Sequence, residues 1–593
     1  MIDKTKYNTY LDDSDIQNGE RCQVACPLHI DMPNIYDLMD KGKYKEAYLL
    51  LKSANPFPAI TGRVCFAPCE HACTRGMLDT PVAIREVEYF LSEYIQSEST
   101  ADLATYKEGS LKGTRKESVA VIGSGPAGMA AAWDLAHYGY KVTIYEKHPV
   151  CGGMAHLGIP VFKILRKVID HEIAVLQRLG VTIVNNVEIG KDLTLDDLKA
   201  QGVSAICIAV GADVGNKLNI PGAEECDKIY ESTEILRLVR MGDRKKLGDN
   251  ILIIGGGNTA MDISRTCKRL GTKKVTVACI ESKDSMPAFD YEFEAAKNEG
   301  VNFQFLAMPK SIEMKNKILV GLKCSHVDPK SFENNPGKDI IVKQDSDFTI
   351  PADSIILSIS QKPNLELLGE NYSDAKNERG LIKQELERGK GGLDGIFAAG
   401  DVITGPRSIV SAFASGRSVA SHIDSYIRKS TEPIKKKYSV LSSKKSGVKF
   451  NFEELKRQRT QKKIPLNLEG NFEIINQKFS ANQAREECDR CMRCNKNIQI
   501  DSKGCINCNY CVNVCPVRCL AMVTENNRVF TNKSELETGE IGTAVMIKDE
   551  LCIRCGLCID VCPVEVISFK CFDIKGPETL SLEKSKGLVN STI

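Results

Sequence analysis

The chain lacks the features that direct a protein to a membrane or to nucleic acid. No apolar run approaches the roughly 18 residues that a membrane span requires, and the N-terminus has no basic segment followed by an apolar one, as a signal peptide does. Lysine and arginine total 79 against 77 acidic residues, so a net charge of +2 gives no field that attracts nucleic acid. We therefore expect a soluble, cytoplasmic protein with no nucleic-acid partner and no membrane span.

A redox-active disulfide motif is also missing. No Cys-x2-Cys or Cys-x4-Cys occurs between Gly123 and Gly416, which argues against a disulfide reductase. The cysteines of that region are scattered, and we interpret them as packing residues. They are Cys151, Cys207, Cys226, Cys267, Cys279 and Cys324.

Cysteine is abundant at both ends of the chain. The 593 residues include 24 cysteines, five of them between Cys22 and Cys73 and most of the rest between Cys488 and Cys571. Cytosolic thiols rarely form structural disulfides, so this density indicates metal binding. At about 150 residues per domain, the length predicts three or four domains.

Residues 119–128 read V-A-V-I-G-S-G-P-A-G, a β-branched run that leads through a glycine turn into an alanine-rich helix. Such a turn lets backbone N–H groups approach a pyrophosphate at the helix N-terminus. The next β-run ends at Glu146, where a carboxylate can accept hydrogen bonds from a ribose. The dinucleotide-binding candidates of this unit are Gly123, Gly125, Pro126, Ala127, Gly128 and Glu146.

A second glycine fingerprint opens at Ile251 and reads I-L-I-I-G-G-G-N-T-A-M-D. Two such units in one chain predict two dinucleotides. Further glycines allow backbone to lie against a flat ring system, and a buried run ends in Gly-Asp, whose carboxylate can bond a ribityl hydroxyl. The additional candidates are Gly153, Gly158, Gly211, Gly400, Asp401, Gly255, Gly257, Asn258 and Thr259.

The strongest motif is a repeat near the C-terminus. Cys505-x2-Cys508-x2-Cys511-x3-Cys515-Pro recurs as Cys552-x2-Cys555-x2-Cys558-x3-Cys562-Pro, the pattern of a two-cluster bacterial ferredoxin. The fourth cysteine of each run ligates the other cluster. We therefore predict one 4Fe-4S cluster on Cys505, Cys508, Cys511 and Cys562, and a second on Cys552, Cys555, Cys558 and Cys515.

The N-terminal cysteines form two groups, Cys22-x3-Cys26-Pro and Cys65-x3-Cys69-x3-Cys73. Thiolates that converge from loops between helices suit iron–sulfur ligation. With Pro81-Val82-x-Ile84 after it, the stretch resembles the helical iron–sulfur domain shared by the glutamate synthase small subunit and the front half of dihydropyrimidine dehydrogenase. The resemblance spans residues 20 to 425.

The resemblance implies two N-terminal clusters. One uses Cys26, Cys65, Cys69 and the side-chain oxygen of Glu88. The other uses the equivalents of Cys22 and Cys73 with an upstream cysteine pair, at positions that hold Ser14 and Gln17 here. Either this second cluster is absent or its missing ligands come from elsewhere in the chain.

A later triad, Cys488-x2-Cys491-x2-Cys494, also suits a metal. Zinc, an iron–sulfur cluster, or donation of ligands to Cys22 and Cys73 all stay open for it.

The resemblance further implies FAD at the first glycine turn and a nicotinamide at the second. NADPH-using members carry an arginine pair before a Met-Pro-Ala, and here these positions hold Ile280 and Glu281. A carboxylate accepts the ribose hydroxyls of NADH and repels a 2′-phosphate, so we expect NADH. Lys283, close by in sequence, offers one positive charge, which would instead attract a 2′-phosphate.

These parts predict a multidomain α/β protein with an N-terminal α-helical iron–sulfur domain, two Rossmann-like domains, one inserted in the other, and an α+β ferredoxin domain. The expected segments are 1–115 (helical iron–sulfur), 116–247 with 360–430 (FAD), 248–359 (NAD), 431–500 (linker with the triad), 501–575 (ferredoxin) and 576–593 (flexible tail).

The predicted function is a flavin and iron–sulfur NAD(P)H oxidoreductase that exchanges electrons with ferredoxin or other redox subunits in a hetero-oligomeric complex. Hydride transfer to a flavin needs no acid or base, so no catalytic residue is predicted. Two alternatives stay open: an electron-transfer subunit that feeds a partner enzyme, and an NADPH-dependent glutamate synthase small subunit.

Overall fold

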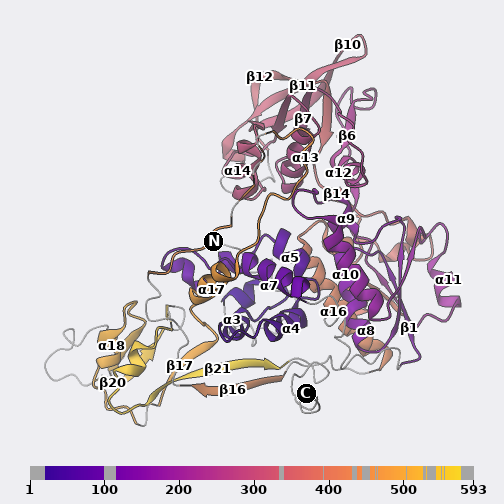
Figure 1. Cartoon of the computed structure of the whole chain (residues 1–593). Coiled ribbons are helices and arrows are strands. Elements are labelled where there is room, and N and C mark those ends of the chain that lie inside the picture. The colour runs from indigo at the N-terminus through magenta and orange to yellow at the C-terminus, as the bar shows by residue number, and fades with distance from the viewer. Residues whose placement is uncertain are drawn as a thin grey trace. The chain divides into compact units, whose positions relative to one another are not determined.

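The computed structural model describes residues 21–98, 115–332, 340–390, 393–429, 437–443, 454–460, 462–463, 465, 467–501, 504–524, 529–530, 542–548, 551–552 and 554–575 (Figure 1). The chain forms two compact units. One comprises Met1–Gly109, Glu432–Thr460 and Lys478–Ile593, and the other comprises Ser110–Thr431 and Gln461–Gln477. Ser14, Gln17 and the predicted tail lie outside the described residues.

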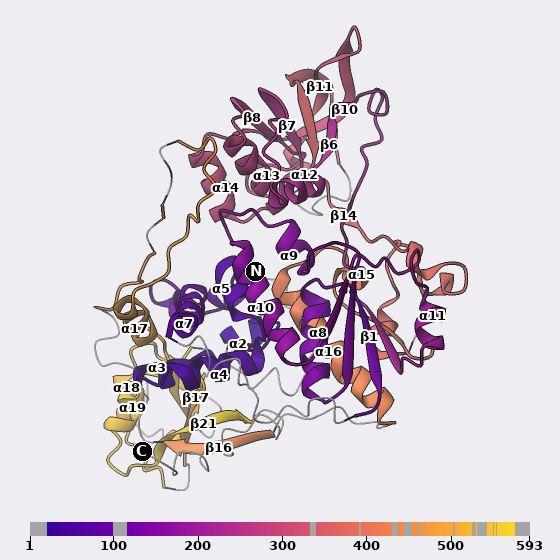
Figure 2. The same ribbon diagram turned by 45° about the vertical axis from the view of Figure 1, so that its right-hand side comes forward.

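The unit that contains both glycine turns begins with a parallel sheet of order β15-β4-β1-β2-β3. Its strands are β1 (Ser118–Ile122), β2 (Lys141–Glu146), β3 (Thr182–Asn185), β4 (Ala205–Ile208) and β15 (Ile396–Ala398). The helices α8 (Pro126–His137) and α16 (Ile409–Ile427) lie next to each other beside β1 (Figure 2). A Cβ on Gly416 would lie 2.1 Å from the carbonyl oxygen of Ala127, so the two helices touch backbone to backbone.

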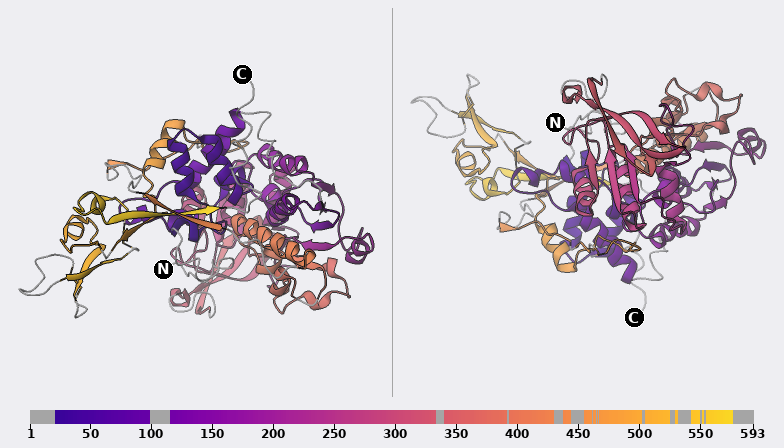
Figure 3. Two further views of the ribbon diagram at one scale, coloured as in Figure 1. Left: turned by 90° about the horizontal axis from the view of Figure 1, so that it is seen from below. Right: turned by 90° about the horizontal axis from the view of Figure 1, so that it is seen from above.

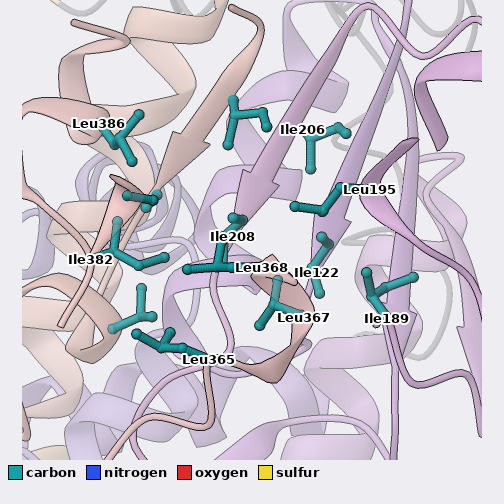
Figure 4. Packing of buried hydrophobic residues seen from close by; sticks show 14 of the residues in the cluster. Ile122, Ile189, Leu195, Ile206, Ile208, Leu365, Leu367, Leu368, Ile382 and Leu386 are labelled. Carbon is teal, nitrogen blue, oxygen red and sulfur yellow. The ribbon is translucent and has the colours of Figure 1, made fainter. Parts of the chain in front are cut away.

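The core of this domain lies against the sheet on the face shown in Figure 4. Alternate residues of β1 and β4, Ile122, Ile206 and Ile208 among them, pack against Leu195 of α11 (Leu195–Ala200). Leu365, Leu367 and Leu368 join the same cluster. The segment that returns to the first sheet after the second one therefore shares a single core with the earlier strands.

A second parallel sheet has the order β6-β13-β7-β8-β9. Its strands are β6 (Ile229–Glu231), β7 (Asn250–Ile254), β8 (Lys274–Ala278), β9 (Asn302–Gln304) and β13 (Ser354–Leu357), with α13 (Asn258–Arg269) after the glycine turn. An antiparallel sheet of β10 (Ala307–Lys315), β11 (Ile318–Val327) and β12 (Val342–Pro351) adjoins it in sequence. Because β6 pairs with β13, the second sheet begins before the expected boundary at residue 247.

Two short strands connect the sheets. β5 (Val214–Gly215) and β14 (Gln361–Lys362) pair antiparallel, where the chain leaves the first domain and returns to it.

The other unit starts with helices α2 (Arg21–Ala25), α3 (Met32–Asp40), α4 (Tyr44–Ala54), α5 (Pro58–Val64), α6 (Pro68–His71) and α7 (Ile84–Glu98). Helical patterning runs from Ile35 to Leu51 in the sequence. The structure breaks it at Gly42, whose φ of 70° lies outside the helical region. A later helix, α17 (Ala481–Asp489), packs on α3 and α7.

The C-terminal repeat folds around two small sheets. β18 (Leu520–Thr524) lies between β19 (Val529–Phe530) and β20 (Gly542–Ile547), and each repeat supplies a short helix, α18 (Tyr510–Val514) or α19 (Leu557–Asp560). β21 (Ile567–Lys575) pairs with both β17 (Lys496–Ile500) and β16 (Lys437–Ser443), and forms a long ribbon with β16 (Figure 3). Nowhere in the described residues is a helix both long and apolar enough to cross a membrane.

Candidate functional site

A cavity of about 690 Å³ opens at the carboxyl ends of the first sheet's strands. This volume falls in the range of about 300–1,000 Å³ usual for cofactor and ligand pockets, and the carboxyl edge is where open α/β sheets bind ligands. Eight predicted residues line the cavity: Gly123, Gly125, Pro126, Ala127, Glu146, Gly153, Gly211 and Asp401. Gly128, Gly158 and Gly400 are not among its lining residues.

The glycine turn is built for close backbone approach. Gly123 has a φ of 100°, and a Cβ there would lie 2.5 Å from the carbonyl oxygen of Ala209. A Cβ on Gly153 would meet the Cα of Gly125 at 2.6 Å, whereas Gly211 has nothing within 4 Å on that side. The turn thus leaves a bare backbone surface toward the cavity, which fits a pyrophosphate and a planar ring.

The glycines outside the cavity have packing roles. A Cβ on Gly128 would lie 2.0 Å from the carbonyl oxygen of Gly123, and one on Gly400 would lie 2.7 Å from the Cβ of Ala127. Gly158 ends the short helix α9 (Gly153–Leu157). Gly128 and Gly400 therefore let helix and strand approach each other behind the cavity.

Glu146 is buried at the end of β2 and is held by the turn itself. Its Oε2 accepts hydrogen bonds from the backbone N–H (3.0 Å) and the hydroxyl of Ser124, and its Oε1 accepts one from the N–H of His148 (2.9 Å). Oε2 thus already accepts two bonds, whereas Oε1 accepts one and keeps a second lone pair that can accept a bond from a ribose.

Asp401 also lines the cavity, at the start of α15 (Asp401–Thr404). Burial raises the pKa of Asp401 to about 6, although the backbone N–H of Arg407 donates to its Oδ1 at 3.2 Å. The first turn of α16 reaches the same cavity through Ala412. A helix N-terminus there favours negative charge on a bound ring.

Several charged residues of the cavity carry no sequence motif. Lys147, Lys191, Arg237 and Asp213 all line it, and Lys147 Nζ lies 2.7 Å from the Asp213 carboxylate. They come from separate loops and helices, so only the folded chain brings them together.

The second glycine turn has the same construction. Gly255 has a φ of 128°, and a Cβ there would lie 2.2 Å from the carbonyl oxygen of Ser358. Gly257 caps α13, whose first turn contains Asn258 and Thr259, and Asn258 Oδ1 accepts a bond of 3.0 Å from the N–H of Phe289.

Glu281 lies over this second turn. A Cβ on Gly256 would be 3.1 Å from Glu281 Oε2, and burial raises the pKa of Glu281. Lys283 points elsewhere, because its Nζ lies over the ring of Phe293, 5.6 Å from the ring centroid. The carboxylate therefore sits at the turn, and the nearby lysine is engaged with an aromatic ring.

The structure gathers the first crossed ferredoxin quartet around one cavity. This cavity is lined by Cys505, Cys508, Cys511 and, from the second repeat, Cys562. Burial raises the pKa of Cys558, and the thiols of Cys552, Cys555, Cys511 and Cys515 add to the rise, so cysteines of both predicted quartets lie near Cys558. Cys519 is buried, and its Sγ lies 3.4 Å from that of Cys515.

The two repeats also share an unusual backbone. Positive φ values occur at the same three positions of each, at Asn507, Asn509 and Arg518 in the first and at Arg554, Gly556 and Glu565 in the second. Left-handed residues turn successive N–H groups to one side, where they can bond to sulfur or other anions. L-residues adopt this conformation uncommonly, and both repeats adopt it at the same places relative to their cysteines.

The N-terminal quartet with an oxygen donor is likewise assembled. Burial raises the pKa of Cys65, and Glu88 and Cys26 add to the rise, while Cys26 and Cys65 act in the same way on Cys69. Glu88 Oε1 accepts hydrogen bonds from Asn55 (2.6 Å) and Thr61 (2.5 Å), and burial raises the pKa of Glu88 to about 7. Because both hydrogen bonds go to Oε1, they orient the carboxylate and leave Oε2 available to a metal.

The remaining cysteine candidates fall into two groups. Cys22, Cys73, Cys491 and Cys494 line one cavity in the N-terminal unit. Cys488 does not line it, and its Sγ instead contacts Met39 Sδ at 3.8 Å in the core. No disulfide joins the cysteines that the structure describes.

Comparison with known proteins assigns each part to a family. Residues 117–416 match the model for pyridine nucleotide-disulphide oxidoreductases, residues 17–100 that for dihydropyrimidine dehydrogenase domain II with a 4Fe-4S cluster, and residues 504–566 that for a 4Fe-4S dicluster domain. The predicted fold class, with an iron–sulfur domain at each end of a Rossmann-like region, is confirmed by these matches.

Three relatives share most of the chain. The NADP(+)-dependent formate dehydrogenase subunit beta of Moorella thermoacetica is 30% identical over 80% of this chain and 70% of its own length. The NADPH-Fe(3+) oxidoreductase subunit beta of Geobacter sulfurreducens is 28% identical over 80% and 75%. The NAD-dependent dihydropyrimidine dehydrogenase subunit PreT of Escherichia coli O157:H7 is 32% identical over 68% and 90%.

Proposed function

Because this chain belongs to the pyridine nucleotide-disulphide oxidoreductase family, we propose that it moves electrons between NADH and one-electron carriers such as ferredoxin. The observation that carries the proposal is the presence, in one chain, of two dinucleotide turns and several cysteine quartets. A flavin in the 690 Å³ cavity would supply the exchange between an electron pair and single electrons.

The chain's own residues bind and orient the cofactors in this proposal. The turn from Gly123 to Gly128 receives the pyrophosphate at the N-terminus of α8, and Glu146 receives the ribose. Asp401 accepts a bond from the sugar-alcohol chain, and the first turn of α16 faces the ring. The cysteine quartets would hold iron–sulfur clusters, which would supply one-electron transfer.

The nicotinamide preference rests on Glu281. Its carboxylate lies at the glycine turn, 3.1 Å from where a Cβ of Gly256 would be, and Lys283 lies over Phe293. A 2′-phosphate would meet a like charge there, which costs several kcal/mol in a partly desolvated site and corresponds to a preference of about a hundredfold for NADH.

An anaerobic titration of flavin absorbance with NADH and with NADPH tests this assignment. Glu281→Arg should shift the preference toward NADPH, whereas Lys283→Ala should leave it unchanged, because that ammonium does not face the turn. Equal reduction by both nucleotides in the unaltered protein would contradict the proposal, as would a Glu281→Arg variant that still prefers NADH.

The relatives named as subunits favour a place in a larger complex. In that second form of the proposal the chain feeds electrons to a partner enzyme. If the isolated protein oxidises NADH with ferredoxin as acceptor, it acts alone; if it does so only after a copurifying subunit is added, it is a feeding subunit. The dicluster domain at residues 504–566 speaks against a glutamate synthase small subunit, and failure to restore glutamate synthesis to an isolated large subunit would remove that alternative.

A further inference from the structure

The four-thiol cavity, defined by Cys22, Cys73, Cys491 and Cys494, joins cysteines more than four hundred positions apart in the chain. Tyr36 and Arg75 also line the cavity. The helix α17, which ends two residues before Cys491, packs on α3 and α7 (Figure 1). We propose that these four cysteines hold a further 4Fe-4S cluster, in which Cys491 and Cys494 replace the cysteine pair that is absent upstream of Cys22.

The chemistry of the donor set favours a cluster over a single ion. A zinc ion draws four ligands to about 2.3 Å, whereas a cubane takes one thiolate at each of four irons and so keeps its sulfurs farther apart. Among the residues that the structure describes, no three His, Cys, Asp or Glu side chains approach closely enough to share one ion. The thiols of the ferredoxin quartets, which also lie among the described residues, are likewise too far apart to share one ion.

The backbone of the donated pair matches that of the other cysteine loops. Arg493, two residues after Cys491, has a φ of 47°, as Asn507 (53°) and Arg554 (56°) have two residues after Cys505 and Cys552. Ala67, two residues after Cys65, has a φ of 54°. The Cys491-x2-Cys494 loop is therefore folded as a cluster-binding loop, and Cys488 stands before it.

Two buried arginines fix this loop to the N-terminal helices. Arg493 is 1% exposed, with Nε 2.7 Å from Asp37 and an ion pair from Nη2 to Asp40, both on α3. Arg490 is fully buried and contacts the Asp79 carboxylate at 2.9 Å and the Thr80 carbonyl at 2.7 Å. These contacts anchor the loop that carries Cys491 and Cys494 to α3 and to the segment that follows Cys73.

The position of this cluster links the two iron–sulfur domains. Met492, which is buried, packs against Cys494 and against Val517 and Cys555 of the ferredoxin repeat. Cys22 lies one helical turn from Cys26 of the oxygen-liganded quartet, and the N–H of Cys26 donates to the Cys22 carbonyl at 3.2 Å. The proposed cluster would therefore stand between the ferredoxin clusters and the N-terminal one.

Anaerobic iron and sulfide counts on the full-length protein test the assignment. Cys22→Ser, Cys491→Ser and Cys494→Ser should each lose about four irons per chain, and the Cys22→Ser/Cys491→Ser double variant should lose no more than either single one. Cys488→Ser, the matched control three residues away, should keep its iron. Loss of iron from Cys488→Ser but not from Cys22→Ser would overturn the proposal, as would zinc in place of iron.

Electron paramagnetic resonance of the dithionite-reduced protein gives a readout that misfolding does not imitate. Neighbouring reduced clusters broaden each other's signals, so the Cys494→Ser variant should show sharper ferredoxin-cluster signals of unchanged intensity. Unchanged broadening in a variant that has lost the four irons would contradict the bridging position. Neither measurement uses a nicotinamide, so its outcome is independent of the proposed function.

Discussion

The ferredoxin repeat and the N-terminal helical domain hold cysteine quartets by different means. In the repeat, three ligands of each quartet lie within seven residues, and the fourth comes from the sister run. In the helical domain, one quartet takes an oxygen from α7, and the other gathers thiols from both ends of the chain. The repeat needs only its own backbone turns, whereas the helical domain needs long-range side-chain pairing.

The largest effect is expected when the crossed ligand of the ferredoxin repeat is removed. Cys562→Ala should abolish the cluster that begins at Cys505, because Cys562 lines that cavity, and about four irons should be lost. Iron analysis with thiol labelling of Cys505, Cys508 and Cys511 checks it. If instead the cluster of Cys552, Cys555 and Cys558 is lost, the ligands are not crossed.

Removing Arg493 tests whether the long-range quartet depends on side-chain anchoring. Arg493→Met leaves Asp37 and Asp40 without their buried partner, and breaking a buried ion pair costs about 3–5 kcal/mol. Denaturant unfolding and iron content measure the effect. Arg518→Ala, an exposed arginine in the ferredoxin repeat with a φ of 50°, is the control and should change stability little. Equal losses in both variants would remove the distinction between the two domains.

A smaller effect is expected at the oxygen ligand. Glu88→Gln keeps an oxygen and the bonds from Asn55 and Thr61 in reach, whereas Glu88→Ala does not. Glu88→Ala should change the spectrum of one N-terminal cluster and leave the ferredoxin signals unaltered, and Glu88→Gln should restore most of the native spectrum. An unchanged spectrum in Glu88→Ala would mean that Glu88 is not a ligand.

The sequence predicted what depends on neighbouring residues. Both glycine turns, the strands that lead into them and the ferredoxin repeat follow local rules, and the structure has β1 and β7 where β-branched runs precede the glycines. The break at Gly42 was not predicted, because the helical periodicity continues on both sides of it.

What escaped prediction depends on tertiary packing. The second sheet starts earlier in the chain than predicted, because β6 pairs with β13. The three residues of β6 are half-buried and have no pattern that marks them as a strand of that sheet. Lys147, Lys191 and Arg237 meet at the first cavity from unrelated segments. The sequence left three alternatives open for the Cys488 triad, and donation of ligands to Cys22 and Cys73 was one of them. No local spacing links Cys491 and Cys494 to Cys22 and Cys73.

Stepwise removal of iron from the native, full-length protein tests the long-range assembly most directly. A chelator would be added in increments under argon, and newly exposed thiols would be alkylated and located by mass spectrometry. Cys22, Cys73, Cys491 and Cys494 should become reactive together, as one group, separately from the group of Cys505 and Cys562. If Cys491 and Cys494 become reactive together with Cys488, while Cys22 and Cys73 react from the start, the long-range quartet does not exist.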